Sequence, residues 1–428
     1  MTNGLVTAGS GQPWESELVA ELDRPGAPLV VVRRCVDLAD VLAEATTGQA
    51  AAVVLAADLR RLDTEAVDRL RAAGVAVVGV HAAADTRAAP RLGRIGIHDV
   101  VPDDAGPARL LSAVRAAIDG RRAGGVPTRL TVSDPQATLP GGPVGPVDPD
   151  PVPAAPVRAP GRVVAVWGPT GAPGRTTVAA GAAVAAAASG CPTLLIDADV
   201  YGGVLASAFG LLDESPGLAG ACRAAANGRL DEAELLRLAW SVGGDGEDLQ
   251  LLTGIARADR WPEVRPSAVP AVLDTARAVA GLVVVDLGFA VEADEELSFD
   301  TVAPRRNGAT LAMLAAADTV LAVGSADPPG IERLVRGVAD LRDALPEVTP
   351  LVVLNRVRRS AATAAEAEAA VRRFTGLEVA ATVPEDRVAL DRAWSAGVPV
   401  ARAAPGSPVT AALRRVAAAV ARPLAVTA

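Results

Sequence analysis

The most conspicuous gap in this sequence of 428 residues is lysine, because all 41 of its basic side chains are arginine. Aromatic residues make up only 2% of a chain that is half hydrophobic, so its cores must be built from Ala, Val and Leu. The two histidines and three cysteines are too few and too widely spaced for an imidazole-rich metal site or a disulfide framework. The composition excludes both kinds of site and predicts a reducing compartment.

Long apolar runs are also missing. The stretches 178–188 and 416–420 fall well short of the roughly 20 residues that a membrane span needs. The N-terminus has no basic segment followed by an apolar one, which predicts that there is no signal peptide. The net charge of −9 argues against a protein that coats nucleic acid through its overall charge. We therefore expect a cytoplasmic protein whose main partner is not nucleic acid.

Three regions of different character follow one another along the chain. Residues 1–122 alternate strand-like apolar runs with segments of helical spacing, which predicts a doubly wound α/β domain. Residues 123–160 are rich in proline and poor in large apolar side chains, as is typical of an extended linker. Residues 161–428 again alternate strands and helices, which predicts a larger, mostly parallel α/β domain. The N-terminal apolar runs are 29–32, 51–55 and 75–80, and the helical segments are 36–45, 63–73 and 107–118.

The N-terminal pattern resembles the receiver domain of response regulators over nearly the whole of residues 1–122. Asp58 follows the apolar run at 51–55, near the position at which a receiver carries its phosphoacceptor. No acidic pair follows a first strand, and Val101 and Pro102 stand where that family has lysine before proline. The resemblance therefore implies a pseudo-receiver used for docking or dimerisation. We interpret Asp58 as a solvated loop carboxylate, with phosphorylation as the alternative.

The stretch from Val163 to Thr177, VVAVWGPTGAPGRTT, has the layout of a phosphate-binding loop. An apolar run leads into a glycine-rich turn and then a helix, so backbone N–H groups can surround a phosphate and the Thr176 hydroxyl can reach Mg²⁺. Arg175 stands where the pattern GxxxxGK[ST] has lysine, and Pro169 where it has glycine. A dinucleotide fingerprint is an alternative, but the spacing here is GxxGxxG rather than GxGxxG.

From Gly161 to about Arg422 the chain resembles the MinD/ParA family of P-loop ATPases, because five motifs occur in that family's order. The motifs are the loop at 170–177 and the stretches LLIDAD, VVVDLG, VLNRV and VPEDRVALDRAWSAGVPV. The resemblance implies an ATP site with Mg²⁺, in which Asp199 lies near the attacking water and Arg175 acts on the phosphates. The implied cofactor-binding residues are Gly171, Ala172, Pro173, Gly174, Arg175, Thr176, Thr177, Asn355, Pro384 and Asp386, and the implied metal site is Thr176, Asp197 and Asp286.

Two departures from the family bear on activity. Thr170 replaces the lysine that normally reaches across a dimer to the partner's nucleotide, and Arg175 replaces the lysine that contacts the β- and γ-phosphates. The planar fork of arginine is bulkier than an ammonium group, so stabilisation of the transferring phosphate should suffer. We therefore expect ATP binding rather than efficient hydrolysis. A loop that merely closes the turn between strand and helix is the alternative.

The order of receiver-like domain, linker and altered ATPase domain resembles the CpaE/TadZ proteins of Flp (Tad) pilus assembly. The stretches DADVYGG, LLTGIARADRW and APRRNGATL strengthen the resemblance. It implies a homodimer that positions pilus or secretion assembly proteins, held through them at the inner face of the membrane or at the cell pole. An active chromosome-partitioning or division-positioning ATPase is the alternative.

The last predicted helix, residues 407–422, carries small apolar side chains at helical spacing. We expect it to pack on the edge of the sheet, with membrane targeting as the alternative. Two arginine clusters, at 305–306 and at 356, 358 and 359, are expected to be solvated surface, with a non-specific DNA contact as the alternative.

Overall fold

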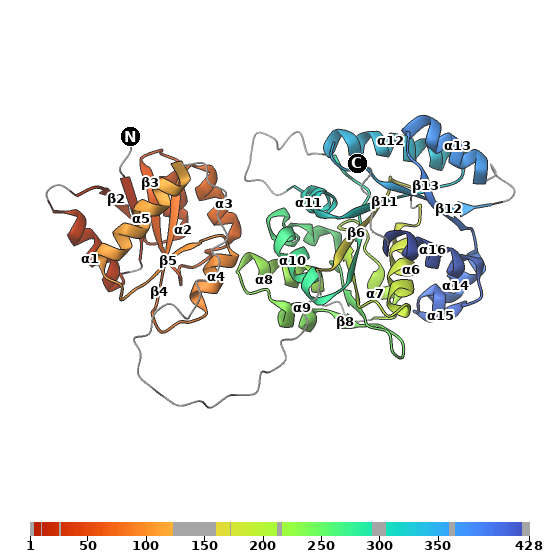
Figure 1. Ribbon diagram of the computed structural model, residues 1–428, viewed down its shortest axis with the longest axis horizontal. Coiled ribbons are helices and arrows are strands. Elements are labelled where there is room, and N and C mark those ends of the chain that lie inside the picture. Colours follow the sequence, from red (N-terminus) through yellow and green to blue (C-terminus); the bar gives the residue numbers. More distant parts are fainter. Residues whose placement is uncertain are drawn as a thin grey trace, which may run out of the picture. The chain divides into compact units, whose positions relative to one another are not determined.

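A computed structural model describes residues 4–9, 11–24, 27–122, 160–171, 173–211, 216–292, 305–358 and 364–421. The chain divides into two compact units, Met1–Ala159 and Pro160–Ala428 (Figure 1). The predicted linker at 123–160 lies outside the described residues, apart from Pro160.

The N-terminal unit contains, within the described residues, a five-stranded sheet with helices on both faces (Figure 1). The strand order is β2-β1-β3-β4-β5 and every pairing is parallel, which is the flavodoxin-like doubly wound arrangement. The predicted α/β class of this unit is therefore confirmed. The strands are β1 (Gly4–Ala8), β2 (Val30–Arg34), β3 (Ala50–Ala56), β4 (Ala76–His81) and β5 (Asp99–Pro102), and the helices are α1 (Pro13–Leu22), α2 (Leu38–Ala45), α3 (Thr64–Ala72), α4 (Ala88–Arg94) and α5 (Pro107–Arg122).

An apolar cluster fills each side of this sheet. On one side Trp14 and Leu18 of α1 pack with Leu110 and Val114 of α5. The other side is covered by α2, α3 and α4. The apolar runs predicted three of the strands, whereas β1 and β5 were missed because GLVTA and DVVP are short and include polar or turn-forming residues.

The C-terminal unit is built, in the part that is described, on an eight-stranded sheet of order β13-β12-β11-β6-β10-β7-β9-β8. All neighbouring strands are parallel except β8, which is antiparallel to β9. The strands are β6 (Arg162–Trp167), β7 (Thr193–Ala198), β8 (Trp240–Ser241), β9 (Leu249–Leu252), β10 (Leu282–Leu287), β11 (Thr319–Ser325), β12 (Leu351–Val357) and β13 (Val379–Pro384). The α-helices are α6 (Arg175–Ala188), α7 (Leu205–Ala208), α8 (Gly217–Ala226), α9 (Glu232–Leu238), α10 (Val269–Val279), α11 (Gly308–Ala316), α12 (Pro328–Ala344), α13 (Ala364–Thr375), α14 (Arg387–Ala396), α15 (Val400–Ala403) and α16 (Pro408–Ala421), and the 3₁₀ helices are Ala258–Glu263 and Pro266–Ala268.

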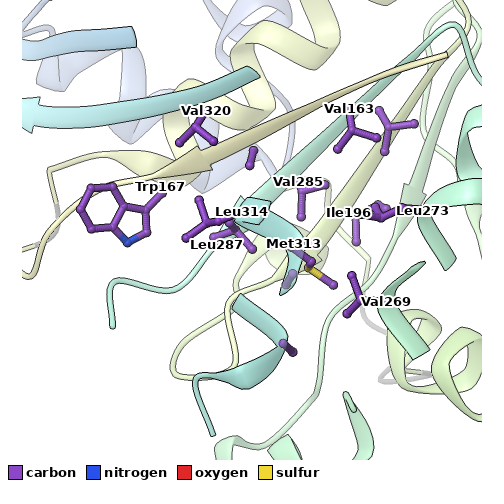
Figure 2. Close-up of a cluster of buried hydrophobic side chains, with 14 of the residues drawn as sticks. Val163, Trp167, Ile196, Val269, Leu273, Val285, Leu287, Met313, Leu314 and Val320 are labelled. Atoms are coloured by element: carbon purple, nitrogen blue, oxygen red, sulfur yellow. The ribbon is translucent and has the colours of Figure 1, made fainter. Parts of the chain in front are cut away.

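The central strands β6, β10 and β7 are buried on both faces, as continuous apolar runs predict. Figure 2 shows one face, where Trp167 of β6 and Val285 of β10 lie in a cluster that includes Leu273 of α10 and Met313 of α11. The other face is covered by α6, α14 and α16. Because β6, β10 and β7 are parallel, their carboxyl ends lie at the same edge of the sheet. Parallel α/β sheets bind their ligands at this edge.

Helix α6 is rich in alanine, so a neighbouring helix can approach it closely. Leu413 of α16 lies over Gly181, where a Cβ would come within 2.4 Å of Leu413 Cδ1. Val409, Val416 and Val420 are buried in the same cluster. The apolar side of α16 is therefore turned toward α6 and the edge strand β13, as predicted. No helix in the described part of the chain combines the length and the apolar character needed to cross a bilayer.

Candidate functional site

The turn between β6 and α6 carries the predicted loop, and its backbone requires glycine. A Cβ at Gly168 would lie 2.3 Å from the carbonyl oxygen of Val323 on the neighbouring strand β11. Gly171 and Gly174 have φ angles of +99° and +100°, which other residues rarely adopt. Because α6 begins at Arg175, the first N–H groups of the helix have no partner within it. The structure places Gly171, Pro173 and Gly174 in the loop and Arg175, Thr176 and Thr177 in the first turn of α6, whereas Ala172 lies outside the described residues.

The guanidinium of Arg175 is engaged by the protein itself. Its Nη1 donates to the carbonyl oxygens of Gly168 and Pro169, each at 3.2 Å, and its Nη2 donates to Oδ2 of Asp199 at 3.3 Å. The two side chains of the ion pair are only 12% and 8% exposed, so solvent screens it little. The charge that was expected to contact phosphate is therefore already compensated.

Asp197 and Asp199, at the carboxyl end of β7, hold the segment that follows this strand. Oδ1 of Asp199 accepts hydrogen bonds from the backbone N–H groups of Tyr201 and Gly202 at 2.9 and 3.1 Å. Asp197 is buried and accepts from the N–H of Leu205 at 3.0 Å and of Asp199 at 3.3 Å. Burial raises the pKa of Asp197 to about 6. Both carboxylates thus shape the backbone beside the loop.

Asp286 differs from these two carboxylates in its hydrogen bonding. It lies in β10 in register with Asp197 and is fully buried, and neither Oδ atom has a partner among the described residues. Burial, followed by the charge of Asp197, raises the pKa of Asp286 well above its ordinary value. The nearby Thr176 hydroxyl opposes this rise in pKa, although it lies outside hydrogen-bonding geometry. An unpartnered buried carboxylate of this kind is suited to a cation or its bound water.

The residues present fit a magnesium ion that arrives with a nucleotide. No group of three or more Asp, Glu, His or Cys side chains in the described ranges could hold a metal ion alone. Mg²⁺ at nucleotide sites takes its ligands from phosphates, from water and from one or two protein oxygens. Thr176 and Asp286 would supply these oxygens, with Asp197 beside them on β7. The bound ion would neutralise phosphate charge.

Asn355 of β12 ties the loop to the sheet. It is 7% exposed, and its Nδ2 donates to the carbonyl oxygen of Pro173 at 2.8 Å. A Cβ at Gly174 would lie 2.1 Å from the same Nδ2. The residue predicted to contact adenine therefore contacts the phosphate loop, a role that its motif did not indicate.

Asp386 and Pro384 lie at the start of α14 and at the end of β13. Oδ1 of Asp386 accepts from the N–H of Ala389 at 3.0 Å, and its Oδ2 accepts from the Ser407 hydroxyl at 2.7 Å. These two hydrogen bonds, with the one from Ala389 first, lower the pKa of Asp386. Asp386 therefore caps α14. This helix also forms one wall of a small apolar hollow that opens to solvent beside Thr176 and Thr177.

Sequence reasoning missed the side chains that connect the segments around the loop. Arg306 lies 3.8 Å from the ring centroid of Tyr201 and donates to the carbonyl oxygen of Val200 at 3.2 Å. The Tyr201 hydroxyl donates to Oδ1 of Asn307 at 2.7 Å. These contacts join the segment after β7 to the start of α11. No spacing in the sequence marks them, since they join residues 106 positions apart.

The arginine clusters differ in their contacts. Arg305 is exposed, whereas Arg306 is half-buried over Tyr201. Arg358 pairs with Glu385 at 3.4 Å, and Arg359 lies outside the described residues. The expectation of solvated surface is therefore wrong for Arg306, whereas Arg356 and Arg358 are exposed.

In the N-terminal unit, Asp58 lies just after β3, and both of its oxygens accept from Nε2 of Gln12 at 3.2 Å. Gln12 is oriented in turn by the indole N–H of Trp14, which donates to its Oε1 at 2.7 Å. The partner of Asp58 in this structure is thus a neutral amide.

The comparisons with known proteins agree with the larger unit. The model of the CobQ/CobB/MinD/ParA nucleotide binding domain matches residues 164–400. Among curated proteins, none matches the chain. A ParA family ATPase structure from Chlorobium tepidum TLS is 18% identical with a TM-score of 0.51, covering 60% of this chain and 98% of that one. The predicted P-loop NTPase fold is confirmed.

Two further structures are similar at the same low level of identity. The cell division ATPase MinD of Pyrococcus furiosus is 20% identical with a TM-score of 0.49, covering 61% of this chain and 98% of that one. The septum site-determining protein MinD of Pyrococcus horikoshii OT3, complexed with Mg-ADP, is 18% identical with a TM-score of 0.47. The match covers 60% of this chain and 95% of that one.

Proposed function

Because the chain belongs to the CobQ/CobB/MinD/ParA nucleotide-binding domain family, we propose that it binds ATP with Mg²⁺ and hydrolyses it weakly or not at all. The ion pair between Arg175 and Asp199 carries this proposal. An arginine bonded to two loop carbonyls and to Asp199 must give up these contacts before it can stabilise a transferring phosphate. The described conformation therefore opposes catalysis more than it opposes binding.

Several features support the binding half of the proposal. The loop glycines and the first turn of α6 offer backbone N–H groups to phosphate. Thr176 and the unpartnered Asp286 suit Mg²⁺. The hollow beside Thr176 and Thr177, lined on one side by Leu390 and Ala393 of α14, offers apolar surface to the nucleoside.

The cellular role that we propose is that of a CpaE/TadZ-like spatial organiser of Flp/Tad pilus or secretion assembly. The protein would act as a homodimer and reach the membrane or the cell pole through its assembly partners. The order of the two units and the stretches DADVYGG and APRRNGATL support this role. The N-terminal unit would be a docking module, since Asp58 accepts from Gln12 and belongs to no metal-binding group of carboxylates among the described residues.

Titration of the full chain with a fluorescent ATP analogue, with and without Mg²⁺, tests the binding half. We expect saturable binding that Mg²⁺ strengthens, and weaker binding in Asp286→Ala, which loses the predicted metal contact. Asp274→Ala, at an exposed position of α10, is the matched control and should bind like the wild type. Absence of binding at millimolar ATP would refute the proposal and leave a structural role for the loop.

A phosphate-release assay tests the catalytic half. We expect turnover far below the roughly 1 s⁻¹ lower end of typical enzymes. Robust turnover that disappears in Asp199→Ala and Asp286→Ala would instead identify an active partitioning or positioning ATPase.

Three further experiments test the role of the whole chain. Deletion of the gene should abolish pili, and a fluorescent fusion should gather where the pilus machinery assembles. Acetyl phosphate should leave Asp58 of the intact protein unmodified. Diffuse fluorescence with normal pili would refute the pilus role, and a phosphorylated Asp58 would refute the docking-only role of the N-terminal unit.

A further inference from the structure

The phosphate loop is contacted by a helix that none of the sequence motifs includes. In α12, a Cβ at Gly337 would lie 3.0 Å from Cβ of Pro169 and 3.2 Å from Cη2 of Trp167. The absence of a side chain at Gly337 therefore lets the helix lie directly against the loop. Because residues four apart share one side of a helix, Arg333 also faces the loop.

Arg333 lies along Gly171. Its Nη1, Cζ and Cδ atoms are 2.6, 3.2 and 3.3 Å from the position that a Cβ at Gly171 would occupy. Glycine is thus needed at 171 for two reasons, namely its φ of +99° and the space that the arginine fills. The guanidinium consequently lies one residue away from Thr170, the position at which the loop pattern of this family has a lysine.

The charge of Arg333 is not compensated. The residue is exposed and makes no hydrogen bond or ion pair within the described part of the chain. Its neighbour Arg336, by contrast, pairs with Glu332 at 2.5 Å. Arg175, the other arginine at the loop, pairs with Asp199. Of these three arginines, Arg333 is therefore the one available to an anion.

We propose that Arg333 is a phosphate-binding residue that supplies positive charge beside position 170, where the loop has no lysine; this inference rests on the proposed binding of ATP at the loop. Its guanidinium donates two hydrogen bonds to the terminal phosphate of a nucleoside triphosphate, because its planar fork matches two phosphate oxygens. The long, exposed side chain can reorient without breaking a hydrogen bond or an ion pair to the described residues. A diphosphate lacks the terminal group, so Arg333 makes the site prefer ATP to ADP.

The test compares fluorescent ATP and ADP analogues on the full chain with Mg²⁺. In Arg333→Ala, the affinity for the triphosphate should fall about ten- to a hundredfold, the range expected for a lost hydrogen-bonded charge, while the affinity for the diphosphate changes little. Arg333→Lys should recover part of the loss, since it keeps the charge but not the fork. Arg336→Ala is the matched control on the same helix and should resemble the wild type.

The outcomes separate this inference from the proposed function. If the wild type binds ATP and Arg333→Ala binds it equally well, the role of Arg333 is refuted and nucleotide binding stands. Equal weakening of ATP and ADP in Arg333→Ala, with an unchanged melting temperature, would also refute a contact to the terminal phosphate. If the wild type binds neither nucleotide, both proposals are refuted.

Discussion

Nη2 of Arg175 lies 3.3 Å from Oδ2 of Asp199, so the first residue of α6 is joined to the residue that follows β7. Asp199 also accepts the N–H groups of Tyr201 and Gly202. One arginine therefore connects the phosphate loop with the segment after β7, and the rest of the site depends on whether this connection is kept when a ligand binds.

Replacing Arg175 by lysine should raise the rate of ATP hydrolysis. A lysine ammonium is compact and cannot bridge two carbonyl oxygens and Asp199 as the guanidinium does, so its charge becomes available to the phosphates. We expect phosphate release to rise by about tenfold or more. Arg402→Lys is a suitable control, because Arg402 likewise contacts a carbonyl oxygen and a carboxylate, those of Val242 and Glu247, away from the loop. An unchanged rate in Arg175→Lys would show that the arginine does not limit turnover.

Asp286→Asn should stabilise the protein in the absence of nucleotide. The substitution replaces an unpartnered buried carboxylate by a neutral amide of similar size. Because the folded pKa of Asp286 is raised, its carboxyl group destabilises the fold at pH values above its unfolded pKa, whether it stays ionised or takes up a proton. The free energy of unfolding at pH 7.5 should rise by about 1 kcal/mol or more, equivalent to a few degrees in melting temperature. The same variant should lose the stabilisation that Mg-ATP gives the wild type. A lower melting temperature in Asp286→Asn would contradict this account of the carboxylate.

Glu15→Gln should change how the stability of the N-terminal unit depends on pH. Burial alone would raise the pKa of Glu15, but the Thr7 hydroxyl, the Arg34 guanidinium and the N–H of Gly9 together hold it below its ordinary value of 4.5. Because the folded pKa is lowered, ionised Glu15 stabilises the unit above pH 4.5, and this stabilisation is lost as the pH falls through the folded pKa.

At pH 7 we therefore expect Glu15→Gln to lower the free energy of unfolding by about 1 kcal/mol or more. The difference from the wild type should shrink toward pH 3. Hydrogen exchange of peptides from α1 and β1, measured across this pH range, reports it. Glu17→Gln, at an exposed position of the same helix, should show no such trend. A difference that is constant with pH would exclude the ionised carboxylate as its source.

Gly174→Ala should be more destabilising than Gly190→Ala. Both glycines have positive φ, of +100° and +83°, so alanine costs about 1 kcal/mol of backbone strain at either position. Only at Gly174 does a Cβ also collide with Asn355, because nothing lies within 4 Å of a Cβ at Gly190. Chemical unfolding of both variants isolates the contribution of the contact with Asn355. Equal losses would mean that Asn355 moves aside without penalty.

The sequence predicted those features that follow from local pattern and from sheet geometry. The resemblance to the MinD/ParA family implied that Asp197 and Asp286 lie together, and the register of β7 with β10 places them opposite one another. The glycines of the loop could be predicted from the sequence because a tight strand–turn–helix connection needs backbone conformations that other residues rarely adopt.

The side-chain partners within the site could not be read from the motifs. The pair of Arg175 with Asp199 and the bond of Asn355 to Pro173 each depend on which of several nearby groups a side chain chooses. Arg333 reaches Gly171 only because α12 packs against the loop, and that packing joins residues more than 150 positions apart. No periodic pattern or motif spacing in the sequence marks such contacts.

The contact of Gly337 with Pro169 means that the loop packs correctly only with a residue from a distant part of the chain. The phosphate-loop pattern places a glycine at 169, and here the small residue stands on the facing helix instead. A graft of residues 168–177 into another scaffold would carry the proline without the recess that accommodates it. Any chimera of this protein should therefore exchange the loop and α12 as one module, and position 337 should vary in step with position 169 among its relatives.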